Sequence, residues 1–391
     1  MRAGRHDDAM DAVHSFAEAT DLTRIDARTR HDFLAALAWL SAVQWQADLA
    51  AKNSKARSRS AGPLWPSGGA MPCPAEIVGR APSTGGSPLL SVMIPVYNVA
   101  NPDWLEQSIE SARVQALKAY RTEIIVVDDR SGNDEARTIA EQFGGDVRYE
   151  RNTGNLGILA NHNRCIALAS GRFVHILHQD DRIEPGFYQA TIEPMLQDES
   201  LVAAFTRAGK IDTHGKEFRQ QDLLATAAGP VENLARMLAL RQHISFPSMI
   251  VRRAAYARVG GFSKDLDFAF DQEMWSRLAA AGPVWYDPRL LAYHREHPAA
   301  VTSQTSAINQ MTDCFRAVAH MTVLFPAAEQ PEIARVALAR IIYGRLVAAT
   351  TAAPKRSDAS RTADVVGFIL RHWPDAGARQ KITQALGFRA S

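Results

Sequence analysis

The chain is poor in cysteine, carries no excess of charge of either sign and has no long hydrophobic run. Its 391 residues include three cysteines, Cys73, Cys165 and Cys314, which lie far apart and are odd in number. This spacing matches neither a metal-binding cluster nor a disulfide framework, so we expect a reducing compartment. A formal net charge of +2 does not indicate a protein that binds nucleic acid, and no such partner is expected.

Signals for membrane insertion and export are also missing from the sequence. No stretch approaches the ~20 apolar residues that a transmembrane helix needs. The first residues, MRAGRHDDAMDAV, lack the apolar core of a signal peptide. We therefore expect a cytoplasmic protein, and we leave open that it contacts the inner face of the membrane.

The length exceeds that of one ordinary core, so several units are expected. Composition divides the chain into an N-terminal helical extension (1–52), a Pro/Gly/Ser-rich linker (53–88), an α/β domain (89–304) and a C-terminal helical region (305–391). An amphipathic helix is expected over 331–350, with arginines among apolar residues. Such a helix suits packing on the core, homodimer formation or membrane contact, and the first is favoured.

Apolar segments alternate with amphipathic ones between residues 89 and 300. LLSVMIPVY, EIIVVDD and RFVHILHQDD predict buried strands, while DWLEQSIESARVQAL and NDEARTIAEQF predict helices, the second with Asn133 as its N-cap. Repeated strand–helix units with apolar strands predict a mostly parallel sheet with helices on both faces. Ligands bind beyond the carboxyl ends of the strands in such sheets.

Two pairs of adjacent acids fall at predicted strand ends. Burying a carboxylate is costly without a cation or hydrogen bonds. Asp180 and Asp181 suit a divalent cation, or else form an acidic turn in which Asp181 caps the next helix. Asp128 and Asp129 suit a nucleobase or ribose, or else complete a polar turn. Either pair alone is a weak signal, and both together favour a common crevice.

Three further segments carry candidate side chains. NTGNLGILANHN (152–163) enters a helix through a Gly-containing turn, which suits an anion or is purely structural. Asp271 and Glu273 lie among aromatic residues at a predicted helix start, which suits a general base or a favourable helix-dipole interaction. His294 and His297 suit a metal or a phosphate, although a lone histidine is more often structural.

Together these motifs resemble family 2 glycosyltransferases with the GT-A fold, over about residues 89–300. The resemblance rests on SVMIPVYN, EIIVVDDRSGND, NLGILANHNRCIALASGRFVHILHQDD and GGFSKDLDFAFDQEMWSRLAAAG in that order. It implies a Rossmann-like, mostly parallel mixed α/β sheet and an inverting transfer from a nucleotide-diphosphate sugar, with UDP-sugars favoured. It also implies Mn²⁺ or Mg²⁺ as cofactor and a glycan or lipid-linked acceptor, as in polysaccharide biosynthesis.

The resemblance also implies roles for individual residues. The donor would be bound by Pro95, Tyr97, Asn98, Asp128, Asp129, Asn155, Gly157, Asn163 and Asp180. The metal would be held by Asp180 and Asp181, with His297 as a further ligand. Asp271 matches the catalytic base, and Glu273 is the second choice.

One departure from the family's pattern keeps a second function open. Members often have LDxDD where this chain has LHQDD, so His178 stands in place of the first acid. A catalytically degenerate GT-A domain that binds nucleotide sugars or serves as a scaffold is therefore the alternative. Nucleotidyl transfer is less favoured, because PVYNVANPDW lacks a Gly-rich basic loop.

Overall fold

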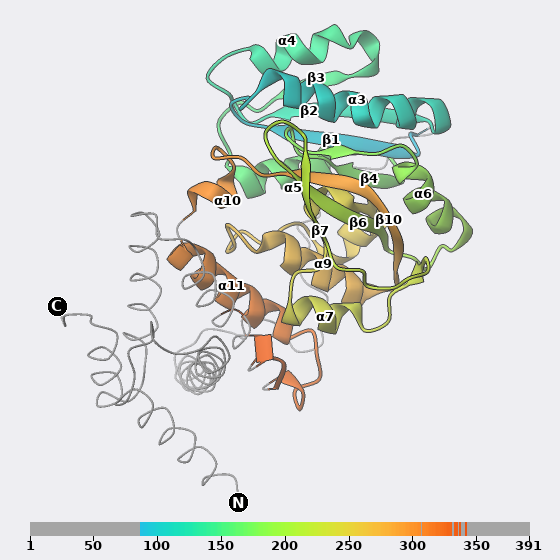
Figure 1. Ribbon diagram of the computed structural model, residues 1–391, viewed down its shortest axis with the longest axis vertical. Helices are drawn as coiled ribbons and strands as arrows, with labels where there is room; N and C mark the ends of the chain where they lie inside the picture. Colours follow the sequence, from blue (N-terminus) through green and yellow to red (C-terminus); the bar gives the residue numbers. More distant parts are fainter. Residues whose placement is uncertain (1–86, 306, 331, 335, 338–340, 342–391) are drawn as a thin grey trace, which may run out of the picture. The chain divides into compact units, whose positions relative to one another are not determined.

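The computed structural model describes residues 87–305, 307–330, 332–334, 336–337 and 341 (Figure 1). The chain divides into one unit of Trp65–Gln304 and another of Met1–Leu64 with Thr305–Ser391. Within the second unit, α11 (Ala307–Thr322) is helical. The predicted N-terminal extension (1–52), nearly all of the predicted linker and most of the predicted 331–350 helix lie outside the described residues.

The first of these units is built on a mixed sheet of ten strands in the order β3-β2-β1-β4-β9-β6-β10-β5, with β7 beside β6 and β8 beside β10. The strands are β1 (Leu90–Val96), β2 (Thr122–Asp128), β3 (Arg148–Arg151), β4 (Phe173–Ile176), β5 (Arg182–Ile183), β6 (Ala203–Ile211), β7 (Glu217–Gln220), β8 (Gly229–Pro230), β9 (Met249–Arg252) and β10 (Val284–Arg295). Parallel ladders join β1 to β2 and β4, β2 to β3, and β6 to β10. The other ladders are antiparallel.

Register brings the carboxyl ends of the central strands to one edge. In the parallel pairs, Val96 at the end of β1 lies opposite Asp128, and Met93 lies opposite Ile176 at the end of β4. Every residue of β1 and β4 is buried, as expected for parallel strands covered on both faces. The segments that follow β1, β2 and β4 therefore meet at one place.

Helices cover both faces of this sheet, as predicted. The helices of this unit are α3 (Pro102–Ala119), α4 (Glu135–Gln142), α5 (Ile158–Leu168), α6 (Phe187–Gln197), α7 (Leu234–Leu240), α8 (Arg253–Val259), α9 (Phe270–Ala281) and α10 (Val301–Gln304), with 3₁₀ turns η1 (Gly144–Asp146) and η2 (Phe246–Ser248). The apolar faces of α3, α4 and α6 share one core with alternate residues of β1 such as Val92 and Ile94. In Figure 1, α3 and α4 lie above β1 and β2, and α5 lies below them.

Helix starts show where local sequence signals hold and where they fail. Asn101 caps α3 by accepting a hydrogen bond from Asp103 N at 2.9 Å, and Pro102 opens the helix as its missing N–H allows. The predicted cap of α4, Asn133, is wrong by one residue, since Asp134 is the N-cap. Asn133 Oδ1 instead accepts from Glu135 N at 3.3 Å within the preceding turn.

The alternative in which Asp181 caps a helix is also wrong. The chain enters β5 directly after Asp181, and α6 begins later, with Gly186 as its N-cap. Gly186 has φ 93°, in the left-handed region that favours glycine. Asp181 is therefore free to serve another purpose.

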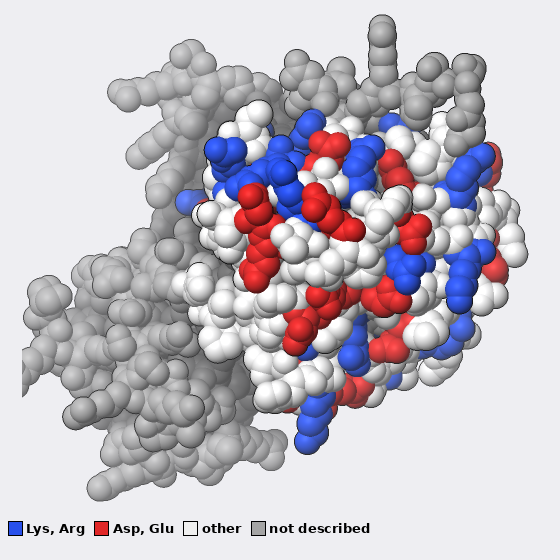
Figure 2. Space-filling model, turned by 90° about the horizontal axis from the view of Figure 1, so that it is seen from above, with Lys and Arg blue, Asp and Glu red and all other residues white. Residues whose placement is uncertain are grey.

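The surface carries no field of a single sign on the face that Figure 2 shows. Lys and Arg side chains there lie among Asp and Glu side chains, in keeping with the net charge of +2. Within the described part of the chain, no helix has the length and apolar character needed to cross a bilayer.

Gly171, just before β4, offers a test of the packing at the centre of the sheet. A Cβ there would lie 2.7 Å from Ser91 N and 2.8 Å from Leu90 C, both backbone atoms that cannot yield. We expect Gly171→Ala to lower the free energy of unfolding by ~1–3 kcal/mol through overpacking. The measurement is the urea midpoint at constant m-value.

Gly145→Ala is the matched control. A Cβ at Gly145 would meet nothing within 4 Å among the described residues. Equal midpoints for the two variants would contradict the close approach at Gly171.

Candidate active site

A cavity of about 880 Å³ opens at the carboxyl ends of β1, β2 and β4. Of the predicted site residues, its lining includes Pro95, Tyr97, Asn98, Asp129, Asn155, Gly157, Asp180, Asp271 and His297. Four other predicted residues, Asp128, Asn163, Asp181 and the second-choice base Glu273, lie outside this lining. Most of the residues predicted at the strand ends therefore line one cavity, and the others lie elsewhere in the protein.

The loops after β1 and β2 are joined by Asn98. Its backbone N donates to Ser131 Oγ at 2.9 Å, and its Oδ1 accepts from Gly132 N at 3.0 Å. Asn98 has φ 46°, which asparagine tolerates better than most residues. Next to it, Tyr97 is 51% exposed, so an aromatic face is available at the rim for stacking.

Asp128 and Asp129 have different environments although they are adjacent. Asp128 is fully buried, and its oxygens accept from Ser131 N, Ser131 Oγ and Tyr149 OH at 2.5–2.9 Å. Burial and this hydrogen bond raise the pKa of Tyr149 to about 12. These contacts leave Asp128 inside the protein, holding β3 to the β2 turn.

Asp129 holds the loop that enters α5. It accepts from Leu156 N at 2.8 Å, from Gly157 N at 2.9 Å and from Asn152 Nδ2 at 2.9 Å. Asn155 Nδ2 donates back to the Asp129 carbonyl at 3.2 Å. The predicted nucleotide loop is therefore anchored on this acid at the cavity wall.

Asn163 joins two distant segments. Its Nδ2 donates to Phe262 O at 3.0 Å, and its Oδ1 accepts from Phe262 N at 2.7 Å. Both ends of the amide are thus used within the protein, and Asn163 fixes α5 to the segment before α9.

The Asp180–Asp181 pair separates into one buried and one cavity-lining carboxylate. Asp181 has no exposed surface, and its Oδ1 accepts from Arg295 N at 2.9 Å and lies 3.2 Å from His294 Nδ1. Burial raises the pKa of Asp181, but the neighbouring His294 imidazole offsets burial, and the pKa lies below its ordinary value. Burial alone would lower the pKa of His294, but the contact with the Asp181 carboxylate outweighs burial and raises the pKa to about 9.

Arg295 holds this acidic turn in place, although no motif in the sequence pointed to it. It is 1% exposed; its Nε donates to Asp180 O at 2.9 Å and its Nη2 to Gln107 Oε1 at 3.1 Å. The guanidinium also lies 5.1 Å from the ring centroid of Trp104. The segment YHREH, in which Arg295 lies between two histidines, matches no arginine motif, so Arg295 was not predicted as a site residue.

A group of metal-ligating side chains lies at this turn. Ligand atoms of His178, Asp180 and Asp181 lie within 4.8 Å of one another. Asp181 Oδ2 is buried and has no hydrogen-bond partner among the described residues, so its surroundings suit a bound cation. The residues present therefore fit a divalent metal.

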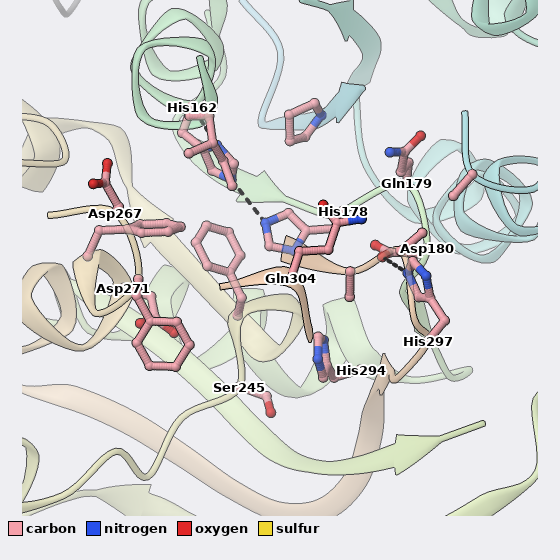
Figure 3. A pocket seen from close by; sticks show the side chains of 18 of the residues that line it. His162, His178, Gln179, Asp180, Ser245, Asp267, Asp271, His294, His297 and Gln304 are labelled. Atoms are coloured by element: carbon pink, nitrogen blue, oxygen red, sulfur yellow. Dashed lines mark hydrogen bonds and ion pairs between the residues drawn. The ribbon is translucent and has the colours of Figure 1, made fainter. Parts of the chain in front are cut away.

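His297 contacts Asp180 and lies outside this trio. Its Nε2 is 2.8 Å from Asp180 Oδ2, which Figure 3 marks with a dashed line. Its ring lies 4.7 Å from that of Trp104, centroid to centroid. This placement orients the Asp180 carboxylate, and direct ligation by His297 stays a prediction.

Asp271 lies across the pocket from Asp180, in the first turn of α9 (Figure 3). Gln242 Nε2 donates to its Oδ2 at 2.9 Å, and Gln272 N donates to its Oδ1 at 2.7 Å. Burial raises the pKa of Asp271 to about 6, in spite of these hydrogen bonds. A carboxyl group that lines a cavity and has a pKa close to neutral pH suits the role of general base. Gln242 follows α7 in a loop without sequence signal.

Glu273, the second choice for the base, has a structural partner. It is 3% exposed, and its two oxygens accept from Arg277 Nε and Nη2 at 2.7 Å each. Glu273 is not part of the cavity lining, which removes it from the candidates for the base.

His162, which the sequence analysis did not single out, contacts the residue that replaces the family's first acid. Its Nε2 lies 2.9 Å from His178 Nε2 (Figure 3), and its Nδ1 lies 2.7 Å from Ile158 O. Burial lowers the pKa of His162 to about 3. The ring lies among Phe246, Phe262 and Phe270.

Known proteins with related sequences point in the same direction as the geometry. A family model described as glycosyl transferase family 2 matches residues 91–260. An uncharacterized protein of Mycobacterium tuberculosis is 31% identical over 236 residues, which are 56% of this chain and 71% of that protein. An uncharacterized glycosyltransferase of Rickettsia typhi is 27% identical over 231 residues, 58% of this chain and 69% of that one.

A solved structure shares the fold. The crystal structure of S. aureus TarS 1-349 in complex with UDP-GlcNAc has a TM-score of 0.55 at 17% identity, covering 76% of this chain and 89% of that chain. At this identity the likeness shows the fold.

The buried ion pair of α9 yields a prediction that separates structure from catalysis. Glu273→Gln leaves the Arg277 charge buried without its partner, since both side chains are 4% exposed. Removing one member of a buried pair costs ~3–5 kcal/mol, so we expect a loss of unfolding free energy of that order. Chemical denaturation measures it.

Glu110→Gln is the control, because it breaks an exposed ion pair of the same kind with Arg113. We expect a cost below ~1 kcal/mol there. A Glu273→Gln protein as stable as this control would show that the buried pair contributes nothing.

Proposed function

The chain belongs to glycosyl transferase family 2, and we propose that it moves a sugar, with inversion, from a nucleotide-diphosphate donor to an acceptor hydroxyl. The observation that supports this proposal is a single cavity lined by Tyr97, Asp180 and Asp271. An aromatic platform, a candidate metal ligand and a candidate base thus line the same space. A glycan or lipid-linked acceptor, a cytoplasmic location, membrane contact and a homodimer stay predictions.

The donor's nucleotide is assigned to the side of the cavity formed by the loops after β1 and β2. Pro95 and Tyr97 line that side, with the Asn155–Gly157 loop beside them. The exposed Tyr97 ring suits a flat base. TarS has been crystallised with UDP-GlcNAc and with UDP, which favours uridine for this chain too.

The diphosphate is assigned to the acidic turn. Asp180 and Asp181 would hold a divalent cation, Mn²⁺ or Mg²⁺, with His297 orienting Asp180. When bound, such a cation stabilises the charge of the leaving nucleoside diphosphate. Arg295 holds the turn itself through the Asp180 carbonyl and the Asp181 carboxylate.

Asp271 is proposed to take the proton from the acceptor hydroxyl. It lies across the pocket from Asp180 (Figure 3), on the side from which an acceptor would attack the face opposite the leaving group. The bond from the acceptor oxygen to the anomeric carbon forms as the bond to the diphosphate oxygen breaks, through an oxocarbenium-like state. Gln242 fixes one oxygen of the base at 2.9 Å, so the carboxylate is oriented before the acceptor arrives.

A degenerate, binding-only domain remains the second candidate. Its support is His178 in place of an acid and the use of both Asp129 oxygens within the protein. Measurable turnover with any donor dismisses it.

Metal-dependent nucleotide binding is the first expected outcome. Calorimetric titration with UDP, GDP and dTDP should show one preferred nucleotide in Mn²⁺. Its affinity should fall by at least ~10-fold in EDTA or in Asp180→Asn, since the ligand shell is lost. Asp222→Asn, which alters an exposed acid of the same cavity, is the control. A folded protein that binds no nucleotide under any of these conditions refutes the donor assignment.

Substitution of the base should affect chemistry and spare donor binding. We expect Asp271→Asn to lower kcat by ~10²–10⁴-fold with unchanged affinity for the nucleotide. Because the carboxylate form acts as base, wild-type kcat/KM should be full above pH about 6 and decline as the pH falls through that pKa. Asp267→Asn, in the same cavity, is the control. A pH profile without this acidic limb would exclude Asp271 as the base.

A further inference from the structure

The hydrogen bonds of His162 fix which nitrogen of its ring carries a hydrogen. Its Nδ1 lies 2.7 Å from the Ile158 carbonyl oxygen, which can only accept. His162 Nδ1 therefore donates. The ring is 2% exposed among the edges and faces of three phenylalanines, surroundings that keep an imidazole neutral. A neutral ring with its hydrogen on Nδ1 presents a lone pair on Nε2.

This lone pair in turn determines the state of His178. The two Nε2 atoms lie 2.9 Å apart, so one must donate, and only His178 can. With its hydrogen on Nε2, His178 presents the Nδ1 lone pair on the other side of the ring. That side faces the acidic turn, where Nδ1 lies 3.5 Å from Asp181 Oδ2.

A proton does not close this gap. Charge-assisted N–H···O hydrogen bonds measure ~2.7–2.9 Å, and 3.5 Å exceeds even the ordinary range. Asp181 Oδ2 is buried and, within the described ranges, finds no hydrogen-bond partner. An imidazole nitrogen and a buried carboxylate oxygen therefore lie close together without a hydrogen bond, an arrangement that a bound cation would satisfy.

Asp180 completes the set. Donor atoms of His178, Asp180 and Asp181 lie within 4.8 Å of one another. Ligands of one ion at ~2.0–2.2 Å lie up to about 4.4 Å apart, so small side-chain rotations suffice. The other oxygen of Asp181 is already engaged by Arg295 N and His294. The histidine that replaces an acid thus belongs to the donor set.

We propose that His178 Nδ1 ligates the metal together with Asp180 and Asp181, and that His162 is a positioning residue that holds His178 in the ligating tautomer. A mixed nitrogen–oxygen set favours Mn²⁺ and later transition metals over Mg²⁺, which prefers oxygen alone. The proposal rests on the proposed function for its role at the donor diphosphate. Its evidence, however, concerns metal binding alone.

Pulsed EPR of Mn²⁺ bound to the full chain tests the ligand directly, first without and then with UDP. Wild-type protein should show ¹⁴N hyperfine coupling from one imidazole. His178→Asp should still bind Mn²⁺, lose the coupling and gain at least ~10-fold in the affinity for Mg²⁺ relative to Mn²⁺. His178→Asn serves the same purpose if a third carboxylate prevents folding. His214→Asn, in an exposed turn, is the control.

The positioning role has its own readout. His162→Phe keeps an aromatic ring but removes the acceptor, and should weaken Mn²⁺ binding by ~10–100-fold. His162→Gln offers an amide oxygen that accepts from His178 Nε2, and should recover part of the loss. Equal affinities in the two variants would overturn the role of His162.

The outcomes separate this proposal from the proposed function. Nitrogen coupling that persists in the His178 variants would assign ligation to His294 or His297 and overturn the proposal. Mn²⁺ that fails to bind the folded wild type with or without UDP would overturn it as well. Sugar transfer without ¹⁴N coupling would support the proposed enzyme activity and would exclude His178 as a metal ligand. A ¹⁴N coupling in a protein that neither binds nucleotide nor transfers sugar would support His178 as a metal ligand and would refute the proposed function.

Discussion

The buried carboxylate of Asp181 is the contact on which the candidate site depends. It has no exposed surface, so its charge requires partners inside the protein. The N–H of Arg295 and the imidazole of His294 supply them from the end of β10. The turn after β4 is thereby joined to a strand more than a hundred residues later. The Arg295 side chain then extends the connection to Asp180 and to Gln107 in α3.

The fold was predictable where the sequence pattern is local. The apolar runs of β1, β2 and β4 and their carboxyl-end acids were visible in the sequence, and the predicted mixed sheet with helices on both faces is confirmed. The four-residue β3 was also visible, as VRYERN, but the two-residue strands β5 and β8 were not. β5 has two residues, and its pairing of Ile183 with Ala292 is a tertiary contact that no window of sequence contains. The cap of α4 moved by one residue because backbone geometry, and not residue type alone, decides which residue begins a helix.

The sequence was enough to predict that the site lies at the strand ends. It was not enough to predict which partners each side chain there contacts. Adjacent acids look equivalent in sequence, yet Asp128 is bonded by Tyr149 from β3, whereas Asp129 receives the backbone of the α5 entry loop. Asn163 is engaged by Phe262, 99 residues away. By contrast, the Glu273–Arg277 pair has the i, i+4 spacing of helix neighbours. That signal was present in the sequence and argues against Glu273 as a base.

The charge balance of the acidic turn explains how two neighbouring carboxylates coexist. Each has its own imidazole, since Asp181 pairs with His294 and Asp180 with His297. Against the effect of burial, the Asp181 charge raises the pKa of His294 to about 9, so this contact favours the charged form of the ring beside the carboxylate. A third acid at position 178 would attract a divalent cation more strongly but would repel the donor diphosphate. An imidazole there attracts a hard cation such as Mg²⁺ less strongly than a carboxylate would, because Mg²⁺ prefers charged oxygen ligands. In return, it adds no negative charge that would repel the anionic donor. On this balance the histidine is compatible with catalysis, so the loss of an acid from the motif does not by itself identify a degenerate domain.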